Sequence, residues 1–322
     1  MTVRLKPDAT VEATVTLNRG WSYRAQVGAE AVGLTVLDYL ATTRTHSTAV
    51  EWADRFERGE VEIEGARAQP ATVLRAGQAI VWHRPPWDEP EVPSQFAIVY
   101  EDDSLVAVDK PSGLPTMPAG GFLEHTLLHL LRERFPEASP LHRLGRSTSG
   151  LVLFARTHDA AATLSKAWRD HEVKKTYRAL GQSVADTDRF VMAAAIGPVP
   201  HPQLGNVHAA STIGKASRSV ATVLERGENH TLFSVDITTG RPHQIRIHLA
   251  CAGHPLVGDP LYDVGGTIKP NPGLPGDGGY LLHAEHLHFL HPLTGTPTTL
   301  MARPPRGLRT RQELATESVH AR

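Results

Sequence analysis

The chain has 322 residues, of which 40% are hydrophobic and 21% charged, and its formal net charge is −1 at pH 7. This length predicts two domains, or one large domain with an appendage, and the mixture is that of a globular protein with a core of normal size. The one cysteine, Cys251, excludes an intramolecular disulfide framework, as is typical of a cytosolic protein.

The N-terminal part alternates short helical and strand-like patterns. Helical spacing of apolar residues predicts two helices, over residues 34–40 and 49–56. Strand-like patterns predict three short strands, over residues 61–65, 72–74 and 79–83. Residues 84–93 contain four prolines, which excludes a helix or a central strand and predicts a linker. We therefore assign residues 1–90 to a small module with its linker.

The second part mixes strands and helices without regular alternation. The patterns predict strands over 97–100, 105–108, 150–155, 175–180, 217–224, 232–237 and 281–289, and helices over 122–135, 160–168 and 242–252. This mixture favours an α+β fold with a large mixed sheet. We assign residues 91–305 to this domain, and the basic, polar residues 306–322 to a flexible tail.

No segment of the sequence predicts export or membrane insertion. The first eight residues carry charge with no apolar stretch behind them, and no uncharged apolar run approaches the ~20 residues that span a bilayer. We therefore expect a soluble protein located in the cytoplasm. The near-neutral charge hides an uneven distribution, because residues 51–109 are acid-rich whereas residues 142–178 carry eight Lys and Arg against three acidic residues.

Three segments of the second part carry residues suited to chemistry or to phosphate binding. Residues 142–150 are H-R-L-G-R-S-T-S-G, residues 175–179 are K-T-Y-R-A, and residues 239–249 are T-G-R-P-H-Q-I-R-I-H-L. The first and third could bind phosphate through side chains and exposed backbone amides, with candidate residues Arg143, Arg146, Thr148, Ser149, Arg241, His243 and Gln244. Taken singly, each motif is weak evidence, and because surface arginines are common a solvated surface would be the favoured interpretation.

Taken in order, these segments resemble the signature motifs of the RluA-type pseudouridine synthase family. That family carries H-R-L-D-R-x-T-S-G-L, K-x-Y-x-A, T-G-R-x-H-Q-I-R-x-H and G-H-P-L-x-G-D-x-x-Y, and the last is matched by residues 253–262. The resemblance covers roughly residues 96–304 and also includes the K-P-S-G turn at 110–113. It implies a pseudouridine-synthase-like domain whose large mixed sheet is mainly antiparallel. Residues 34–83 more faintly resemble the small αL-type RNA-binding module that is often fused ahead of such domains.

The resemblance implies an RNA-modifying isomerase. Such an enzyme flips a uridine out of the RNA, breaks its N-glycosidic bond and rejoins the uracil through carbon. It implies that Arg143 either fills the gap left by the flipped base or contacts a phosphate. It also implies that Tyr177 stacks on the target base, and that Arg246 pairs with the catalytic aspartate. At that aspartate's position this chain has Gly145, which has no side chain to act as nucleophile or base.

Three functions remain open from the sequence. The first is an active RNA pseudouridine synthase acting on ribosomal or transfer RNA, with another group in place of the aspartate. The second is a catalytically inactive RNA-binding protein that keeps the site. The third is a metal-dependent hydrolase built on the histidines at 283, 286, 288 and 291, but the family motif explains two of them. We expect RNA as the partner rather than DNA or a membrane, no metal, no cofactor, and a monomer.

Overall fold

The structure is a computed structural model that describes residues 17–44 and 46–320. Two parts of the sequence-based assignment lie outside the described residues. They are residues 1–16 of the assigned module, which include the eight residues considered for export, and residues 321–322 of the assigned tail. The chain divides into two compact units, with the boundary between Glu89 and Pro90. In the part of the chain that the structure describes, no helix is long and apolar enough to cross a membrane.

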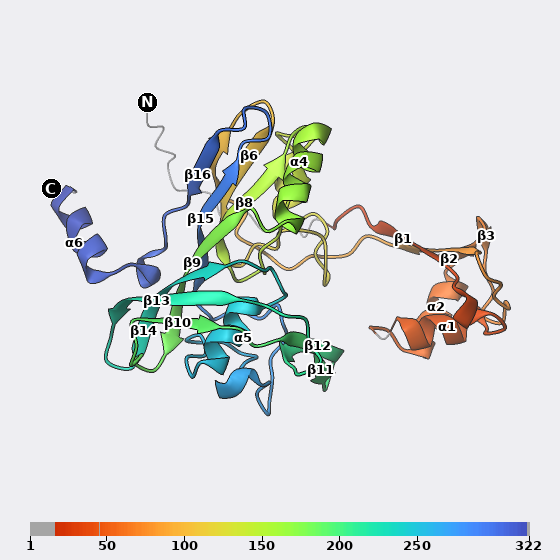
Figure 1. The fold of residues 1–322 in the computed structure, drawn as a ribbon. Helices are drawn as coiled ribbons and strands as arrows, with labels where there is room; N and C mark the ends of the chain where they lie inside the picture. The colour runs from red at the N-terminus through yellow and green to blue at the C-terminus, as the bar shows by residue number, and fades with distance from the viewer. Residues whose placement is uncertain (1–16, 45, 321–322) are drawn as a thin grey trace, which may run out of the picture. The chain divides into compact units, whose positions relative to one another are not determined.

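The first unit packs two helices on one face of a small sheet (Figure 1). Its elements are β1 (Trp21–Gln26), the 3-10 turn η1 (Ala29–Ala31), α1 (Val36–Thr43), α2 (Ala49–Glu57), β2 (Val61–Ile63), β3 (Ala66–Arg67) and β4 (Ala79–Arg84). The strand order is β1-β4-β2-β3, so β1 and β3 are the edges of the sheet. Thr48 and Glu51 form a capping box that fixes the start of α2.

The proline-rich segment after β4 has no regular structure, but its first residues pack on the first unit. The buried Glu89 accepts a hydrogen bond of 2.6 Å from the side chain of Asn18. The same Asn18 side chain accepts one from the backbone of Trp87 at 3.2 Å. This part of the predicted linker therefore belongs to the first unit up to Glu89.

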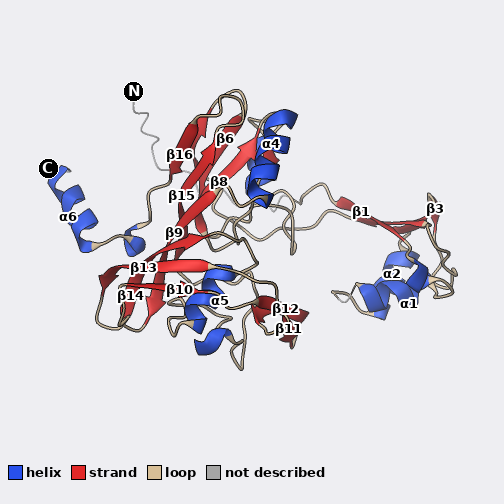
Figure 2. Ribbon diagram, in the orientation of Figure 1, coloured by secondary structure: helices blue, strands red, loops and turns tan. Residues whose placement is uncertain are grey.

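The second unit is built on a large sheet that Figure 2 shows in red. Its strands are β5 (Ala97–Glu101), β6 (Leu105–Lys110), β7 (Ser139–Pro140), β8 (Ser149–Ala155), β9 (Lys174–Gln182), β10 (Arg189–Met192), β13 (Ser219–Arg226), β14 (His230–Ile237), β15 (Leu282–Leu290) and β16 (Pro297–Met301). Within the described residues the order is β10-β13-β14-β9-β15-β8-β6-β5, with β16 on β15 and β7 on β8. Only the β8–β15 pairing is parallel among those described, so the predicted mixed, mainly antiparallel α+β fold is confirmed.

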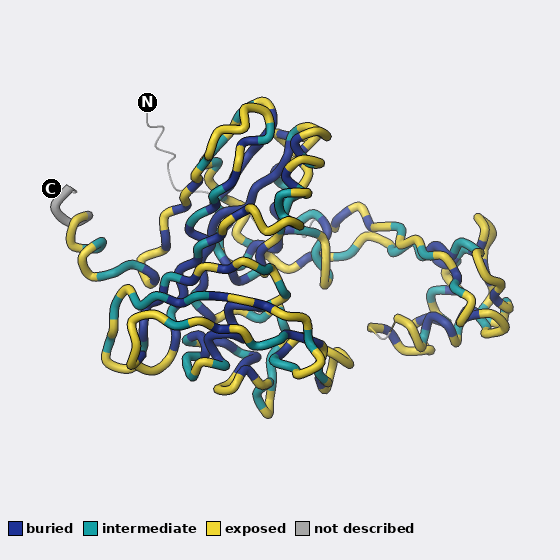
Figure 3. Tube along the Cα trace, viewed as in Figure 1, coloured by how far each residue is buried: buried dark blue, intermediate teal, exposed yellow. Residues whose placement is uncertain are grey.

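Both faces of this sheet are covered, which explains the continuous apolar run of β8. Leu151 and Leu153 pack on one face with Leu164 of α4 (His158–Arg169). Val152 and Phe154 alternate to the other face, where α3 (Leu127–Arg132) and α5 (Gln244–Cys251) contribute to the core. Figure 3 shows the resulting band of buried backbone through the sheet.

The remaining elements lie outside the main sheet. They are the hairpin β11 (Ile196–His201) and β12 (Gly205–Ala210), the turns η2 (Val264–Gly266) and η3 (Arg306–Leu308), and α6 (Arg311–His320). The flexible tail expected over residues 306–322 differs from the structure, in which η3 and α6 form a regular turn and a helix within residues 306–320. The physical reason is that Leu308 is buried, with 1% of its surface exposed, and that Glu313 bonds to Arg178.

Candidate active site

The segment 142–149 leads into β8, and a buried lysine holds it in place. The ammonium group of Lys110, at the end of β6, donates to the carbonyl oxygens of Pro111 at 2.8 Å, Leu114 at 2.7 Å and Arg146 at 3.0 Å. Burial lowers the pKa of Lys110 to about 7, opposed by the neighbouring Asp109. The three carbonyl acceptors match the three N–H donors of the charged form, so Lys110 joins the K-P-S-G turn to the motif segment.

Two hydroxyls add to this attachment. Thr116 donates to the carbonyl oxygen of Leu144 at 2.9 Å and accepts from its N–H at 3.2 Å. Ser112 donates to the carbonyl oxygen of Ser147 at 2.8 Å. The backbone on both sides of Gly145 is therefore fixed by side chains from one short stretch of sequence.

Gly145 itself is exposed and does not need to be glycine. Its φ lies outside the left-handed region, and a Cβ built on it would meet the hydroxyl oxygen of Tyr280 at 3.4 Å and that of Thr148 at 3.7 Å. Both distances are ordinary van der Waals contacts, so a side chain fits. These two hydroxyls lie 3.3 Å apart and form a hydrogen bond. The position is therefore open space beside two hydrogen-bonding groups.

Arg246 has a carboxylate partner, which the sequence left unidentified. Its guanidinium donates two hydrogen bonds of 2.7 Å to the two oxygens of Asp259, and both side chains are almost fully buried. Burial by itself would raise the pKa of Asp259, but Arg246 and the N–H groups of Leu261 and Tyr262 outweigh it and lower that pKa. The pair is thus a fixed, fully charged unit.

Tyr280 connects this ion pair to Gly145. The guanidinium of Arg246 lies 4.3 Å from the ring centroid of Tyr280 and 4.9 Å from that of Tyr262, which are cation–π distances. The hydroxyl of Tyr280 reaches the open space at Gly145. The structure therefore brings Gly145 and Arg246 together around Tyr280, although a hundred residues of sequence separate the first two.

Tyr177 lies on β9 in the same core cluster as Leu144 and Tyr280. Only 8% of its surface is exposed, and burial raises the pKa of its hydroxyl to about 12. No hydrogen-bond partner for that hydroxyl is present among the described residues. Tyr177 therefore offers a neutral aromatic ring with an uncommitted hydroxyl.

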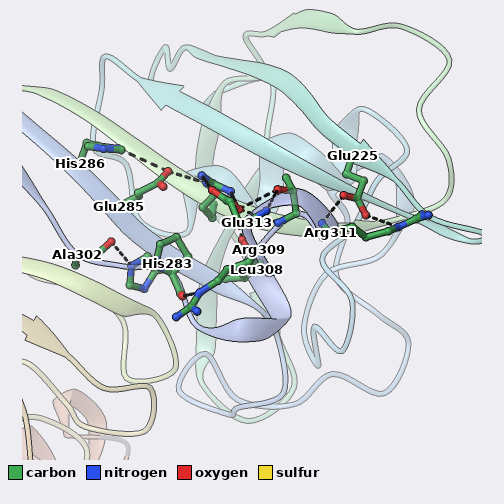
Figure 4. A network of polar contacts seen from close by, with 12 residues as sticks. Glu225, His283, Glu285, His286, Ala302, Leu308, Arg309, Arg311 and Glu313 are labelled. Atoms are coloured by element: carbon green, nitrogen blue, oxygen red, sulfur yellow. Dashed lines mark hydrogen bonds and ion pairs between the residues drawn. The ribbon is translucent and has the colours of Figure 1, made fainter. Parts of the chain in front are cut away.

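Arg178, the next residue on β9, lies on the opposite face of the strand and anchors it. It donates to Glu285 of β15 at 2.8 Å and to Glu313 of α6 at 2.8 Å, both of which are labelled in Figure 4. Glu285 sits at a β-bulge, because Ala284 pairs with Tyr177 and His286 with Thr176. The bulge supplies the carboxylate that secures the strand beside Tyr177.

The predicted RNA-binding residues fall into two groups, those with side-chain donors still available for RNA and those whose polar groups are bonded within the protein. Arg143 is exposed and makes no hydrogen bond or ion pair with the described residues. Arg146, Ser149 and Arg241 each make a single side-chain hydrogen bond to the protein, to Gly276, His283 and Ala216. These four residues can still contact a phosphate.

For the other three, the structure does not support a direct contact with RNA. Gln244 is buried, and all four hydrogen-bonding positions of its amide are used by Thr239, Arg241, Arg218 and Ser219. A sequence pattern cannot distinguish such a loop-fixing glutamine from an exposed one.

Thr148 and His243 are also committed within the protein. Thr148 is buried and bonded to Tyr280. His243 has left-handed backbone (φ 55°), and its ring bonds to the hydroxyl of Tyr262 at 2.7 Å. Burial, assisted by Arg246, lowers the pKa of His243 to about 3, so the ring is neutral and supplies no charge for a phosphate.

The four late histidines have separate partners. His283 bonds to Ser149 and Ala302, His288 to Thr299, and His291 to Asp102. His286 stacks on His288 with ring centroids 5.9 Å apart. Among the described residues no group of three His, Cys, Asp or Glu side chains is placed to hold a metal ion.

Sequence reasoning missed Tyr280 and the pairing of Arg246 with Asp259. Tyr280 lies outside every motif, just before β15, and nothing in its neighbours distinguishes it. Asp259 lies in the G-H-P-L-V-G-D segment, but no spacing rule connects it to Arg246 thirteen residues earlier. Only the fold brings these groups together.

Comparison with known proteins identifies the family to which the chain is similar. Residues 104–251 match the sequence model of a family described as RNA pseudouridylate synthase. An uncharacterized RNA pseudouridine synthase of Synechocystis sp. is 44% identical over 80% of this chain and 89% of that protein. RNA pseudouridine synthase 5 of Arabidopsis thaliana is 36% identical over 85% of this chain and 89% of that protein.

More distant relatives and solved structures point the same way. Ribosomal large subunit pseudouridine synthase D of Neisseria meningitidis serogroup B is 33% identical over 83% of this chain and 74% of that protein. The solved structure of human RNA pseudouridylate synthase domain containing 1 has the same fold, with a TM-score of 0.55 at 24% identity, over 73% of this chain and 98% of that one. The chain therefore belongs to the RluA-type RNA pseudouridine synthases, a family of isomerases, as its motifs predict.

Proposed function

We propose that this chain isomerises specific uridines of ribosomal or transfer RNA to pseudouridine, as a cytoplasmic monomer without a cofactor. The observation that carries the proposal is the grouping of Gly145 and Arg246 around Tyr280, in a chain that spans most of the length of relatives named as RNA pseudouridine synthases. A ribosomal substrate is suggested by a relative named for the large ribosomal subunit.

The reaction breaks the bond between C1′ of the ribose and N1 of uracil, forms a bond from C1′ to C5, and moves the C5 proton away. We assign the stacking on the flipped uracil to Tyr177 because of its place in the K-T-Y-R-A motif. With a pKa of about 12 its hydroxyl is ionised to only about 10⁻⁵ at pH 7, so it acts as a neutral hydrogen-bonding group rather than as a phenolate base.

Phosphates have candidate contacts on the exposed part of the motif segment. Arg143 is uncommitted within the described chain, and Arg146 and Arg241 each have one hydrogen bond to a backbone carbonyl. Guanidinium groups with remaining donors are suited to bind phosphate in a bidentate manner. For Arg143 we keep both roles, phosphate contact and insertion into the stack, as alternatives.

The carboxylate that cleavage of a glycosidic bond calls for is absent at Gly145. Asp259 is the acid held at this site, but it is buried and uses both oxygens on Arg246. This observation favours a second function, that of a catalytically inactive pseudouridine-synthase-like RNA-binding protein. Such a protein would keep the fold and the RNA contacts and form no pseudouridine.

One experiment separates the two functions. Pseudouridines are mapped in ribosomal and transfer RNA from cells with and without this protein, and purified protein is assayed by tritium release from RNA labelled at C5 of uridine. Loss of one defined site in the cells, and tritium release in vitro, support the enzyme. Unchanged maps, with RNA binding intact, support the inactive protein.

A pair of tyrosine variants connects that activity to this site. Tyr177→Ala removes the proposed stacking ring and should abolish tritium release, whereas Tyr177→Phe keeps the ring and tests only the hydroxyl. Tyr39→Phe, at a buried tyrosine in the first unit, is the matched control. Full activity in Tyr177→Ala would contradict the proposed site.

A further inference from the structure

The hydroxyl of Tyr280 lies beside the position at which the motif predicts an aspartate. A Cβ built on Gly145 would lie 3.4 Å from this oxygen. The oxygens of a carboxylate are two bonds beyond Cβ, so the phenol oxygen lies in the neighbourhood in which an aspartate at this position would act. The chain therefore has an oxygen of another kind close to where the carboxylate is missing.

The loop that ends at Tyr280 is held against the motif segment. Arg146 donates from Nε to the carbonyl oxygen of Gly276 at 2.9 Å. Gly278 lies so close to Ser147 that a Cβ on it would meet the hydroxyl oxygen of that serine at 3.3 Å. These contacts keep the loop beside the motif segment, and with it they fix where the tyrosine begins.

Both ends of the Tyr280 side chain are also held. The guanidinium of Arg246 lies 4.3 Å from the ring centroid, and the hydroxyl shares a hydrogen bond of 3.3 Å with Thr148. When Thr148 is the donor, the phenol keeps its own hydrogen for transfer. Gly145 is exposed and has no side chain, so a ribose can approach the phenol oxygen through the space that an aspartate would fill.

We infer that the phenol oxygen of Tyr280 is the nucleophile of this chain, in place of the missing carboxylate. The inference rests on the proposed function, because the reaction is the conversion of uridine to pseudouridine. The oxygen attacks C1′ of the ribose, and the bond from C1′ to N1 breaks with its electron pair on N1. The phenolic proton passes to N1, so the uracil leaves the sugar as a neutral base. Tyrosine has this role at a sugar carbon in a minority of glycosidases.

The second half of the reaction regenerates the tyrosine. The uracil turns within the site until its C5 faces C1′. C5 then forms its bond to C1′, while the bond from C1′ to the tyrosine oxygen breaks and its electron pair returns to that oxygen. The phenolate takes up the C5 proton. The exchange balances, because N1 gains one proton, C5 loses one, and Tyr280 ends as it began.

Two other groups are less suited to this attack. Asp259 is buried and uses both oxygens on Arg246. Tyr177 has no atom within 4 Å of a Cβ built on Gly145, and its place in the K-T-Y-R-A motif assigns it to stacking on the base. The hydroxyl of Tyr280 therefore has the better position for C1′.

The test measures tritium release by the full chain from transcripts of ribosomal and transfer RNA labelled at C5 of uridine. Tyr280→Phe keeps the ring on Arg246 and removes the oxygen. It should lower the rate at saturating RNA by at least about a hundredfold and leave the Kd for RNA unchanged. Tyr100→Phe, which removes a hydroxyl bonded to Asp102 in the same unit, is the matched control and should keep the wild-type rate.

A carboxylate supplied at position 145 gives a second readout. In the Tyr280→Phe background, Gly145→Asp should raise the rate above that of Tyr280→Phe alone, because it brings an oxygen nucleophile to the same ribose carbon. Gly145→Asn in that background should not. A purely structural role of Tyr280 would not be repaired by a negative charge at a different residue.

The outcomes separate this inference from the proposed function. A wild-type rate in Tyr280→Phe, a loss of rate that a weaker Kd explains, or equal rates in the two double variants would overturn the inference while the proposed function stands. Failure of the proposed function gives a different result, because the wild-type chain itself then releases no tritium, and the inference fails with it.

Discussion

Gly145→Asp tests whether the missing carboxylate is the only missing part. The added Cβ would meet the hydroxyl oxygens of Tyr280 at 3.4 Å and Thr148 at 3.7 Å, and the backbone is not left-handed, so strain is absent. Both hydroxyls can donate to the new carboxylate. Arg246 stays bonded to Asp259, so the hydroxyls rather than the guanidinium must orient the aspartate.

The expected size of the effect depends on the native activity. If the chain is inactive, a positioned carboxylate should raise the initial rate of tritium release by at least about a hundredfold, the lower range for one acid–base group. If the native chain is active through another group, the rate should change little or fall. The assay uses 5-tritiated uridine in transcripts of ribosomal and transfer RNA, with wild type beside the variant.

Two further substitutions at Gly145 control for shape. Gly145→Asn has the size of aspartate without its charge and should give no rise in rate. Gly145→Ala should stabilise the fold by about 0.4–1 kcal/mol in urea unfolding, because a residue with a Cβ has fewer unfolded conformations. Equal rates for Gly145→Asp and Gly145→Asn, or a clear loss of stability in Gly145→Ala, would refute the reasoning.

Three other perturbations test the supports of the site. Asp259→Asn leaves the buried charge of Arg246 without its partner and should destabilise the fold by about 3–5 kcal/mol, measured in urea. The pKa of Asp259 is lowered in the folded state, so its contribution to the free energy of unfolding is present above the unfolded-state pKa and is lost as the pH falls through the folded-state pKa. Asp259→Asn should therefore reduce the dependence of stability on acid pH. Lys110→Met leaves two buried carbonyls without their donors, since the third also accepts from Gly113, and should cost about 2–6 kcal/mol in the same measurement. Deleting residues 306–322 removes a buried leucine and the ion pairs of Glu313 and Arg311, so the unfolding midpoint in urea should fall, while a chain with an unchanged midpoint would show that this segment contributes nothing.

The sequence predicts elements well where one periodicity dominates. The strands β8, β9 and β14 agree with the expected ranges within two residues at each end, because apolar positions mark them clearly. The helix expected over 122–135 is only Leu127–Arg132, because Phe122 bridges back to Ala119 and Thr126 is the N-cap. Local turn chemistry of this kind competes with the apolar pattern and is not visible in it.

The hairpin of β11 and β12 shows a different limit. Pro198 and Pro200 argue against a strand, yet both lie in β11. A two-stranded hairpin tolerates them because each strand has an unpaired edge, where the missing N–H costs nothing. At the site, sequence-based prediction is limited because the contacts join residues far apart in the chain. The motifs identify Gly145 and Arg246, but they do not identify Tyr280, whose side chain lies between these two residues in space.

The bulge at Glu285 determines how β9, and with it Tyr177, is aligned against β15. A strand that slips by one residue exchanges its two faces, which would turn Tyr177 away from the core and Arg178 into it. The extra residue in β15 breaks the repeat of the pairing, and its carboxylate accepts a hydrogen bond of 2.8 Å from Arg178, so a slip of β9 by one residue would break this ion pair. The bulge in β15 therefore fixes the register of β9 against β15, and with it the position of the Tyr177 ring along the strand.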